Sequence, residues 1–219
     1  MAKKKALRSP DINTSAIKGL YALTPDTLNT EDLLRRARLA LSGGVQVLQY
    51  RNKIADPDLQ IKQARTLRKL ADEFGVTFIV NDDVQLAALV EADGVHLGAT
   101  DGDIKAARTL LGPDKLIGVS CYNQLSLARS AVRAGADYVA FGAFYTSSVK
   151  PEAAVATLDL LREARAEISV PIVAIGGISA DNGAALVQAG ADALAVISAV
   201  FDATDIQLAA KNLATLFGK

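Results

Sequence analysis

Short apolar runs alternate along the chain with longer stretches of helical periodicity, from Ile17 to the end. The apolar runs are rich in valine, isoleucine and leucine, which is typical of strands buried on both faces. We expect strands at residues 20–23, 45–53, 76–80, 94–97, 116–119, 138–141, 171–175 and 193–197. The stretches between them predict helices, among them residues 30–41 before Gly43 and Gly44, residues 57–74 before Gly75, and a last helix to about Phe217.

This alternation of strand and helix continues without a linker or a change of composition. It predicts the α/β class with a parallel sheet, and eight such units indicate a (β/α)8 TIM barrel with outer helices. The alternative is a doubly wound open sheet, which is less favoured because no Gly-x-Gly-x-x-Gly opens the first helix. We expect residues 1–16 to form an N-terminal tail or cap and residues 17–219 to form a single barrel domain.

One local pattern recurs, at Glu91–Gly94, Ala134–Asp137 and Ala189–Asp192. Each copy has an alanine and an aspartate next to a glycine, just before an apolar run. We interpret each as a helix end turning into the next strand.

The second apolar run, Val45–Lys53, ends in an unusual way, because Gln49, Arg51 and Lys53 are spaced two residues apart. Side chains alternate along a strand, so the three would project to the same side if the strand runs on that far. A solvated strand end is the simplest explanation for two cations there. The alternative is a site for an anionic ligand such as phosphate, which arginine and lysine bind well.

Other polar residues follow the predicted strands in the same way. They are Asn81 and Asp82 after the third strand, Asp101 after the fourth, Ser120 after the fifth, Ser147 and Lys150 after the sixth, Gly176 and Gly177 after the seventh, and Ser198 after the eighth. Taken singly, Asp82 and Asp101 could cap helices, Ser120 could be a turn residue and Lys150 an exposed loop residue. In a barrel all these positions fall on one rim, where active sites lie, so together they predict a single site.

The charges in this set suit two anions. Asp82 and Asp101 offer carboxylate oxygens of the kind that Mg2+ takes, and Mg2+ commonly bridges to phosphate oxygens. Arg51, Lys53 and Lys150 supply positive charge for a diphosphate. Separately, the backbone amides at Gly176–Gly177 and Ile197–Ser198 could cup a monophosphate, because phosphate sites after strands seven and eight recur in this fold.

Few residues could act as a base or a nucleophile. The single histidine, His96, lies inside a predicted strand and is better explained as a buried hydrogen-bonding residue. The single cysteine, Cys121, has no histidine near it in the sequence. The chemistry therefore depends on charge stabilisation and positioning more than on proton abstraction.

Composition narrows the class of partner. The formal net charge is zero, with a pI of about 6.6, which argues against a broad nucleic-acid surface. No apolar run is long enough for a membrane span, and no apolar segment follows the basic N-terminus as a secretory signal requires. With one cysteine, we expect a cytoplasmic protein whose partners are small molecules, with a homo-oligomer left open.

The residues resemble the thiamine phosphate synthase family over nearly the whole barrel. The matching segments, in order, are Gln49–Lys53, Asn81–Asp82, Asp93–Gly98, Gly118–Ser120, Phe141–Lys150, Ala174–Ile178 and Val196–Ser198. Any one segment is a weak signal, but together and in this order they are specific. The resemblance implies that a thiazole phosphate nitrogen displaces the diphosphate of a hydroxymethylpyrimidine, giving thiamine phosphate and pyrophosphate.

The resemblance also implies roles for individual residues. Asp82 and Asp101 would bind Mg2+, and Gln49 would hydrogen-bond the pyrimidine. The diphosphate would be held by Arg51, Lys53, Asn81, Ser120 and Lys150, of which Arg51, Lys53, Ser120 and Lys150 are the expected catalytic residues. Gly177, Ile197 and Ser198 would bind the thiazole phosphate, with Ser147 nearby.

Two positions depart from the family pattern, namely Val149 in place of a hydroxyl residue and Ala99 in place of glutamine. They leave room for a non-catalytic barrel that binds a phosphorylated metabolite. A thiazole tautomerase-like isomerase is a further alternative, but that relative uses a histidine after strand five, where this chain has Tyr122.

Overall fold

A computed structural model of the chain describes residues 16–98, 103–145 and 155–218. The strands form a closed parallel barrel in which each strand pairs with its neighbours in sequence and β8 pairs with β1. They are β1 (Gly19–Leu23), β2 (Val45–Tyr50), β3 (Thr77–Asn81), β4 (Gly94–Leu97), β5 (Leu116–Ser120), β6 (Tyr138–Phe141), β7 (Ile172–Ile175) and β8 (Ala193–Val196). The predicted (β/α)8 TIM barrel is therefore confirmed, and an open doubly wound sheet is excluded.

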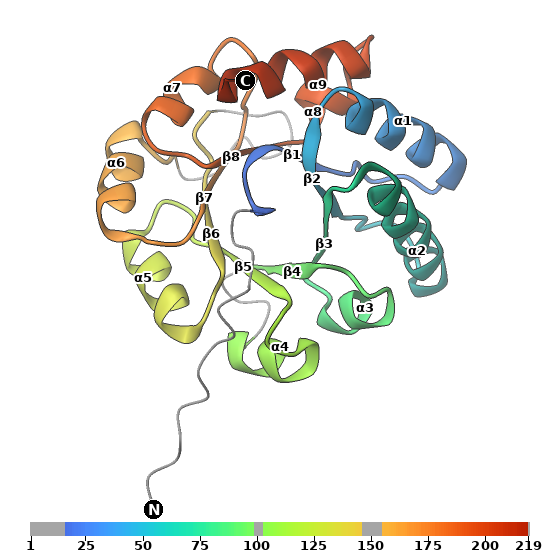
Figure 1. Cartoon of the computed structure of the whole chain (residues 1–219), viewed down its shortest axis with the longest axis horizontal. Helices are drawn as coiled ribbons and strands as arrows, with labels where there is room; N and C mark the ends of the chain where they lie inside the picture. The colour runs from blue at the N-terminus through green and yellow to red at the C-terminus, as the bar shows by residue number, and fades with distance from the viewer. Residues whose placement is uncertain (1–15, 99–102, 146–154, 219) are drawn as a thin grey trace, which may run out of the picture.

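The helices surround this ring of strands, as the view along the barrel shows (Figure 1). They are α1 (Thr30–Ser42), α2 (Pro57–Phe74), α3 (Val84–Leu89), α4 (Ile104–Leu111), α5 (Leu125–Ala134), α6 (Leu158–Glu167), α7 (Gly183–Gln188), α8 (Ser198–Phe201) and α9 (Ile206–Ala214), followed by a 3-10 turn at Thr215–Phe217. No helix in the described ranges is both long enough and apolar enough to cross a lipid bilayer.

Local sequence explains where the longest helix, α2, begins and ends. The Asp56 side chain accepts a hydrogen bond from the Leu59 amide, and Pro57 occupies the first helical turn, where its missing N–H costs nothing. Gly75 ends the helix at a φ of 64°, a left-handed conformation that glycine adopts without penalty.

Apolar side chains form two clusters, one on each side of the strands. The larger cluster fills the space between the strands and the helices. The smaller one lies inside the barrel and includes Tyr21, Val47, Ile79 and Tyr138. Ile17, which precedes β1, is 1% exposed and joins this inner cluster, so the chain enters the barrel directly from its N-terminal segment.

The recurring aspartates form ion pairs near the N-terminal ends of the strands, away from the predicted site. Each carboxylate accepts a hydrogen bond from an amide of the preceding strand: Asp93 from Phe78, Asp137 from Ile117 and Asp192 from Ile172. Each also pairs with an arginine from a helix: Arg68 with Asp93, Arg108 with Asp137 and Arg165 with Asp192. The sequence repeat was interpreted as a turn. Its aspartate also links a helix to two neighbouring strands through an ion pair and a hydrogen bond.

We expect Asp137→Ala to lower the free energy of unfolding by about 3 kcal/mol, because its side chain is fully buried and Arg108 would lose its carboxylate partner. Urea unfolding measures this change. Glu167→Ala is the control, because it removes an ion pair with Arg129 whose side chains are about 40% exposed, and it should leave stability almost unchanged. Equal losses in the two variants would contradict a special role for the buried tie.

Candidate functional site

A cavity of about 510 Å3 opens at the C-terminal ends of the strands. Every predicted site residue that the structure describes lines it: Gln49, Arg51, Lys53, Asn81, Asp82, Ser120, Gly177, Ile197 and Ser198. Asp101, Ser147 and Lys150 lie outside the described residues, as do Ala99 and Val149. The structure thus brings together on one rim residues that are far apart in the sequence.

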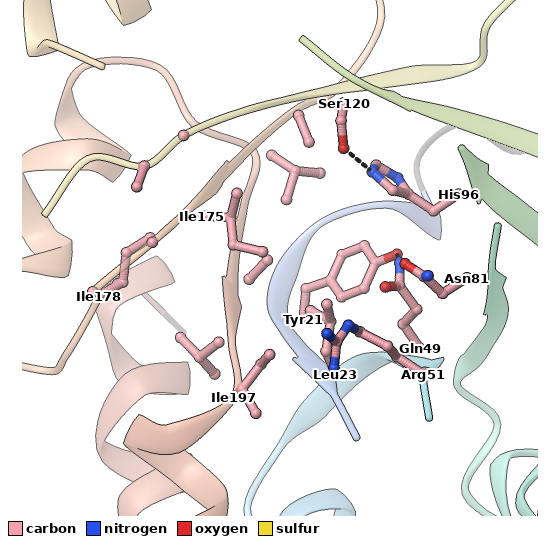
Figure 2. A pocket seen from close by; sticks show the side chains of 18 of the residues that line it. Tyr21, Leu23, Gln49, Arg51, Asn81, His96, Ser120, Ile175, Ile178 and Ile197 are labelled. Atoms are coloured by element: carbon pink, nitrogen blue, oxygen red, sulfur yellow. Dashed lines mark hydrogen bonds between the residues drawn. The ribbon is translucent and has the colours of Figure 1, made fainter. Parts of the chain in front are cut away.

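The cavity has a polar half and an apolar half. Strands β1 to β5 contribute Tyr21, Gln49, Asn81, His96 and Ser120 to its wall, whereas β6 to β8 contribute Ala140, Val173, Ile175 and Ala195. Figure 2 shows Gln49, Arg51, Asn81, His96 and Ser120 on one side, with Ile175, Ile178 and Ile197 opposite them. A ligand with one charged end and one flat apolar part would fit such a cavity.

The expectation that β2 continues to Lys53 is wrong, because the strand ends at Tyr50. Strand alternation therefore does not place Arg51 and Lys53. Instead, the Thr24 hydroxyl donates to the Arg51 carbonyl (2.8 Å) and accepts from the Arg51 amide (2.9 Å). Asp26 holds the next turn, since its Oδ1 accepts from the Arg51 guanidinium (3.1 Å) and from the Lys53 amide (2.8 Å).

Asn81 and Asp82 stand at the end of β3. The Asn81 amide nitrogen donates to Asp82 Oδ2 at 2.6 Å, and the Asp82 backbone N–H donates to the His96 carbonyl at 2.8 Å. Asp82 has a φ of 60°, a conformation that aspartate tolerates better than most residues. The helix-cap explanation for Asp82 is wrong, because Asp83 caps α3 by accepting from the Leu86 amide.

A chain of hydrogen bonds crosses the barrel interior beneath the polar half. Gln49 Nε2 donates to the Tyr21 hydroxyl (2.7 Å), which lies 3.0 Å from the Tyr138 hydroxyl. The Tyr138 hydroxyl is 3.1 Å from His96 Nδ1, and His96 Nε2 is 2.9 Å from Ser120 Oγ. The interpretation of His96 as a buried hydrogen-bonding residue is therefore confirmed.

Burial keeps the histidine and the two tyrosines of this hydrogen-bond chain neutral. It lowers the pKa of His96 to about 4, and it raises the pKa of both Tyr21 and Tyr138 above the usual value for tyrosine. In the described part of the chain, Gln49 Oε1 is the buried side-chain atom that has no hydrogen-bond partner. A buried amide oxygen without a partner is costly, so this atom is a natural acceptor for a ligand N–H group.

Gly176 and Gly177 form the turn after β7, with φ values of 107° and 62°. A Cβ on Gly176 would lie 2.4 Å from the Ala143 Cβ, so a larger residue does not fit there. Asn182 fixes the turn, since its side chain donates to the Gly177 carbonyl (3.0 Å) and accepts from the Ser179 amide (2.8 Å). Ile197 and Ser198, which begin α8, line the same cavity.

Within the described ranges, no three carboxylate, histidine or cysteine side chains cluster in a way that could hold a metal ion. Asp82 is the described member of the predicted carboxylate pair, and Asp101 is outside these ranges. One carboxylate at the rim is nevertheless compatible with Mg2+, which keeps several water ligands and binds phosphate oxygens.

The residues that support the site residues through hydrogen bonds were not identified from the sequence. Tyr21 and Tyr138 are indistinguishable in the sequence from other apolar strand residues, and both are at most 1% exposed. Thr24, Asp26 and Asn182, which hold the two rim turns, were not singled out as site residues either. A polar atom on an otherwise apolar strand is the only signal that could have marked the two tyrosines.

Cys121 is buried, and burial raises the pKa of its thiol to about 12. We expect a disulfide reagent to leave the native protein unmodified at pH 8 and to label one thiol per chain once the protein is unfolded, because Cys121 is the single cysteine. Absorbance of the released thiol measures both. Fast labelling of the native protein would contradict the assignment of Cys121 to the core.

The chain is similar to known proteins over most of its length. A family described as thiamine monophosphate synthase matches residues 20–200. The thiamine-phosphate synthase of Methylobacillus flagellatus is 54% identical over 201 residues, covering 92% of this chain and 96% of the relative. That of Thiobacillus denitrificans is 55% identical over 199 residues, covering 91% and 94%.

Solved structures agree with this. The thiamine phosphate pyrophosphorylase from Pyrococcus furiosus superposes with a TM-score of 0.84 at 36% identity, covering 93% of this chain and 96% of that one. The orotidine 5'-phosphate decarboxylase from Pyrococcus horikoshii superposes with a TM-score of 0.67 at 16% identity, covering 91% and 99%, which is a likeness of fold alone.

Proposed function

Because the chain belongs to the thiamine monophosphate synthase family, whose members are transferases of thiamine biosynthesis, we propose that it joins hydroxymethylpyrimidine diphosphate to thiazole phosphate. The products would be thiamine phosphate and pyrophosphate. The observation that carries the proposal is that one cavity gathers every described residue of the predicted site, with cations and amides on one side and apolar side chains on the other.

In the proposed reaction, the C–O bond between the pyrimidine methylene and the diphosphate breaks first, and the departing oxygen keeps the electron pair. The lone pair of the thiazole nitrogen then forms the new C–N bond. This nitrogen carries no proton that must be removed, so the step needs no general base. That agrees with a cavity whose histidine is held neutral in a hydrogen-bond chain and whose neighbouring cysteine is buried.

Leaving-group stabilisation is the work we assign to the polar half. Arg51 and Lys53 would meet the charge that grows on the diphosphate, and Asn81 and Ser120 would donate hydrogen bonds to it. The sequence-based assignment of Lys150 to the same task concerns a residue outside the described ranges. Thr24 and Asp26 pre-orient the Arg51–Lys53 turn, so little reorganisation is needed when the substrate binds.

Asp82 and Asp101 would hold Mg2+, which would supply further positive charge to the diphosphate oxygens. Asp82 suits this role because its carboxylate is oriented by Asn81 and is not used as a helix cap. The role of Asp101 rests on the sequence alone. The cytoplasmic location that we propose also rests on the sequence alone.

The two rings would occupy the rest of the cavity. Gln49 would bond the pyrimidine through its unpartnered oxygen, and Ala140 and Ala195 leave space on the apolar side for a flat ring. Gly177, Ile197 and Ser198 would bind the thiazole phosphate through the amides of their turns, with Ser147 nearby in the sequence-based assignment.

The alternatives have less support. A tautomerase-like reaction calls for a histidine after β5, whereas Tyr122 stands there and the single histidine lies in β4. A purely binding role does not explain why cations, a carboxylate and the separate Gly176–Gly177 turn occur together in one cavity. Tight product binding without turnover would favour that role over the transferase.

We expect thiamine phosphate to form from the two substrates only when Mg2+ is present. Chromatography of the product, with excess chelator and then with Mg2+ restored, measures this dependence. No product at any Mg2+ concentration would overturn the proposed reaction, and equal rates with and without chelator would overturn the metal assignment.

We expect Asp82→Asn to reduce turnover by about 100-fold, the size of effect found when one preorganised electrostatic group is lost. Asp83→Asn is the matched control, because the neighbouring carboxylate caps α3 and asparagine caps equally well. Lys53→Ala should also cut turnover strongly, whereas Lys62→Ala, on the exposed face of α2, should not. Unchanged turnover in both Asp82→Asn and Lys53→Ala would refute the assignment of the site.

A further inference from the structure

The buried hydrogen-bond chain ends at two residues that line the cavity. Gln49 is at one end and Ser120 at the other. Between them lie Tyr21, Tyr138 and His96, which are respectively 1%, 0% and 9% exposed. The hydrogen-bond chain therefore links Gln49 and Ser120 through side chains that are almost fully buried.

Each of these groups has one hydrogen to give, so the direction of one bond sets the next when every hydrogen is used within the chain. A neutral tyrosine has a single O–H, and a neutral imidazole has a single N–H. If Gln49 donates to Tyr21 and no buried hydrogen is left unused, then Tyr21 donates to Tyr138, Tyr138 donates to His96 Nδ1, and His96 Nε2–H donates to Ser120. If Gln49 instead accepts from Tyr21, every bond in the chain reverses.

The two directions present opposite groups to the ligand. In the first, Gln49 turns its carbonyl oxygen to the cavity and Ser120 is free to donate its hydrogen. In the second, Gln49 presents N–H groups and Ser120 spends its hydrogen on His96. Only the first direction offers a donor to an anion at Ser120.

We propose that Tyr21, Tyr138 and His96 are positioning residues that hold the chain in the first direction. The site then requires a hydrogen-bond donor on the ligand at Gln49 and an anionic acceptor at Ser120. The structure agrees at the first link, where Gln49 Nε2 lies 2.7 Å from the Tyr21 hydroxyl and Oε1 is left buried without a partner among the described residues.

A glycine in β5 makes room for the central bond of the hydrogen-bond chain, between Tyr138 and His96. A Cβ on Gly118 would lie 2.0 Å from the Tyr138 Cζ, so the Tyr138 ring packs directly on the glycine backbone of β5. This close approach lets a hydroxyl from β6 reach past β5 to His96 on β4. The residue type at position 118 thus determines whether the chain can form.

The ligand class follows, and this part rests on the proposed function. An aminopyrimidine offers an exocyclic N–H donor, whereas the analogue with an oxo group in place of that amine presents an acceptor at the same position and carries its hydrogen on a ring nitrogen. The oxo analogue would place its oxygen against Gln49 Oε1, and turning the amide would disturb every bond as far as Ser120. The hydrogen-bond chain would therefore favour aminopyrimidines over oxopyrimidines, although the pyrimidine contact at Gln49 is remote from the diphosphate contact at Ser120.

The direction is tested in the wild-type protein without any substrate. Because His96 is the single histidine, labelling with 15N-histidine gives one pair of ring nitrogen signals. At pH 7 we expect the neutral tautomer with the hydrogen on Nε2 and a bare Nδ1. A hydrogen on Nδ1 would overturn the proposal.

The selectivity is tested with Tyr138→Phe, which keeps the ring and removes the hydroxyl. We expect the preference for the amino substrate over its oxo analogue, measured as the ratio of kcat/KM values, to fall by about tenfold. Tyr50→Phe is the matched control, because this buried β2 tyrosine makes its hydrogen bond to Gln63 on α2, outside the barrel interior, and its ratio should not change. An unchanged ratio in Tyr138→Phe would overturn the proposed selectivity.

The two tests separate this inference from the proposed reaction. Absence of turnover with both pyrimidines would defeat the proposed function, while the histidine tautomer would still decide the direction of the chain. Normal turnover together with the wrong tautomer would defeat the inference and leave the function intact.

Discussion

The polar side chains inside the barrel are almost fully buried, and their need to pair with one another is the constraint on which the site depends. An unpaired buried hydroxyl or amide costs about 1–3 kcal/mol, so two tyrosines, a histidine and a glutamine can share this space only as a connected chain. Their pairing leaves Gln49 Oε1 as the atom still to be satisfied, in a side chain that lines the cavity. The arrangement that stabilises the core therefore also sets what the site can bind.

Stability and chemistry lie at opposite ends of the barrel. Near the N-terminal ends of the strands, Asp93, Asp137 and Asp192 each join a helix arginine to a strand amide, and none of them lines the cavity. At the other end, Arg51 and Lys53 remain available to a ligand because Asp26 bonds them mainly at the backbone and at one guanidinium nitrogen. The ion pairs that tie helices to strands are therefore separate from the charged residues that line the cavity.

The strand-and-helix order and the rim residues could be predicted because both depend on local signals. Apolar runs, glycine stops such as Gly75 and polar residues after strands are visible in the sequence itself. The reason for placing Arg51 and Lys53 was nevertheless wrong, since β2 ends before them and Thr24 and Asp26 hold them. Contacts between separate loops leave no periodic pattern, so only their end point, a shared rim, could be anticipated.

By itself, the sequence determined that the chain forms a barrel and that polar residues from its strand ends meet at one rim, because alternation and strand direction are properties of successive residues. Only the tertiary structure decided how the interior is connected. Tyr21 and Tyr138 are 117 positions apart, and their hydroxyls come within 3.0 Å only because the barrel closes and Gly118 leaves room for the ring. The direction of a hydrogen-bond chain is not a property of any single residue, because it depends on which hydrogen each neighbouring group donates.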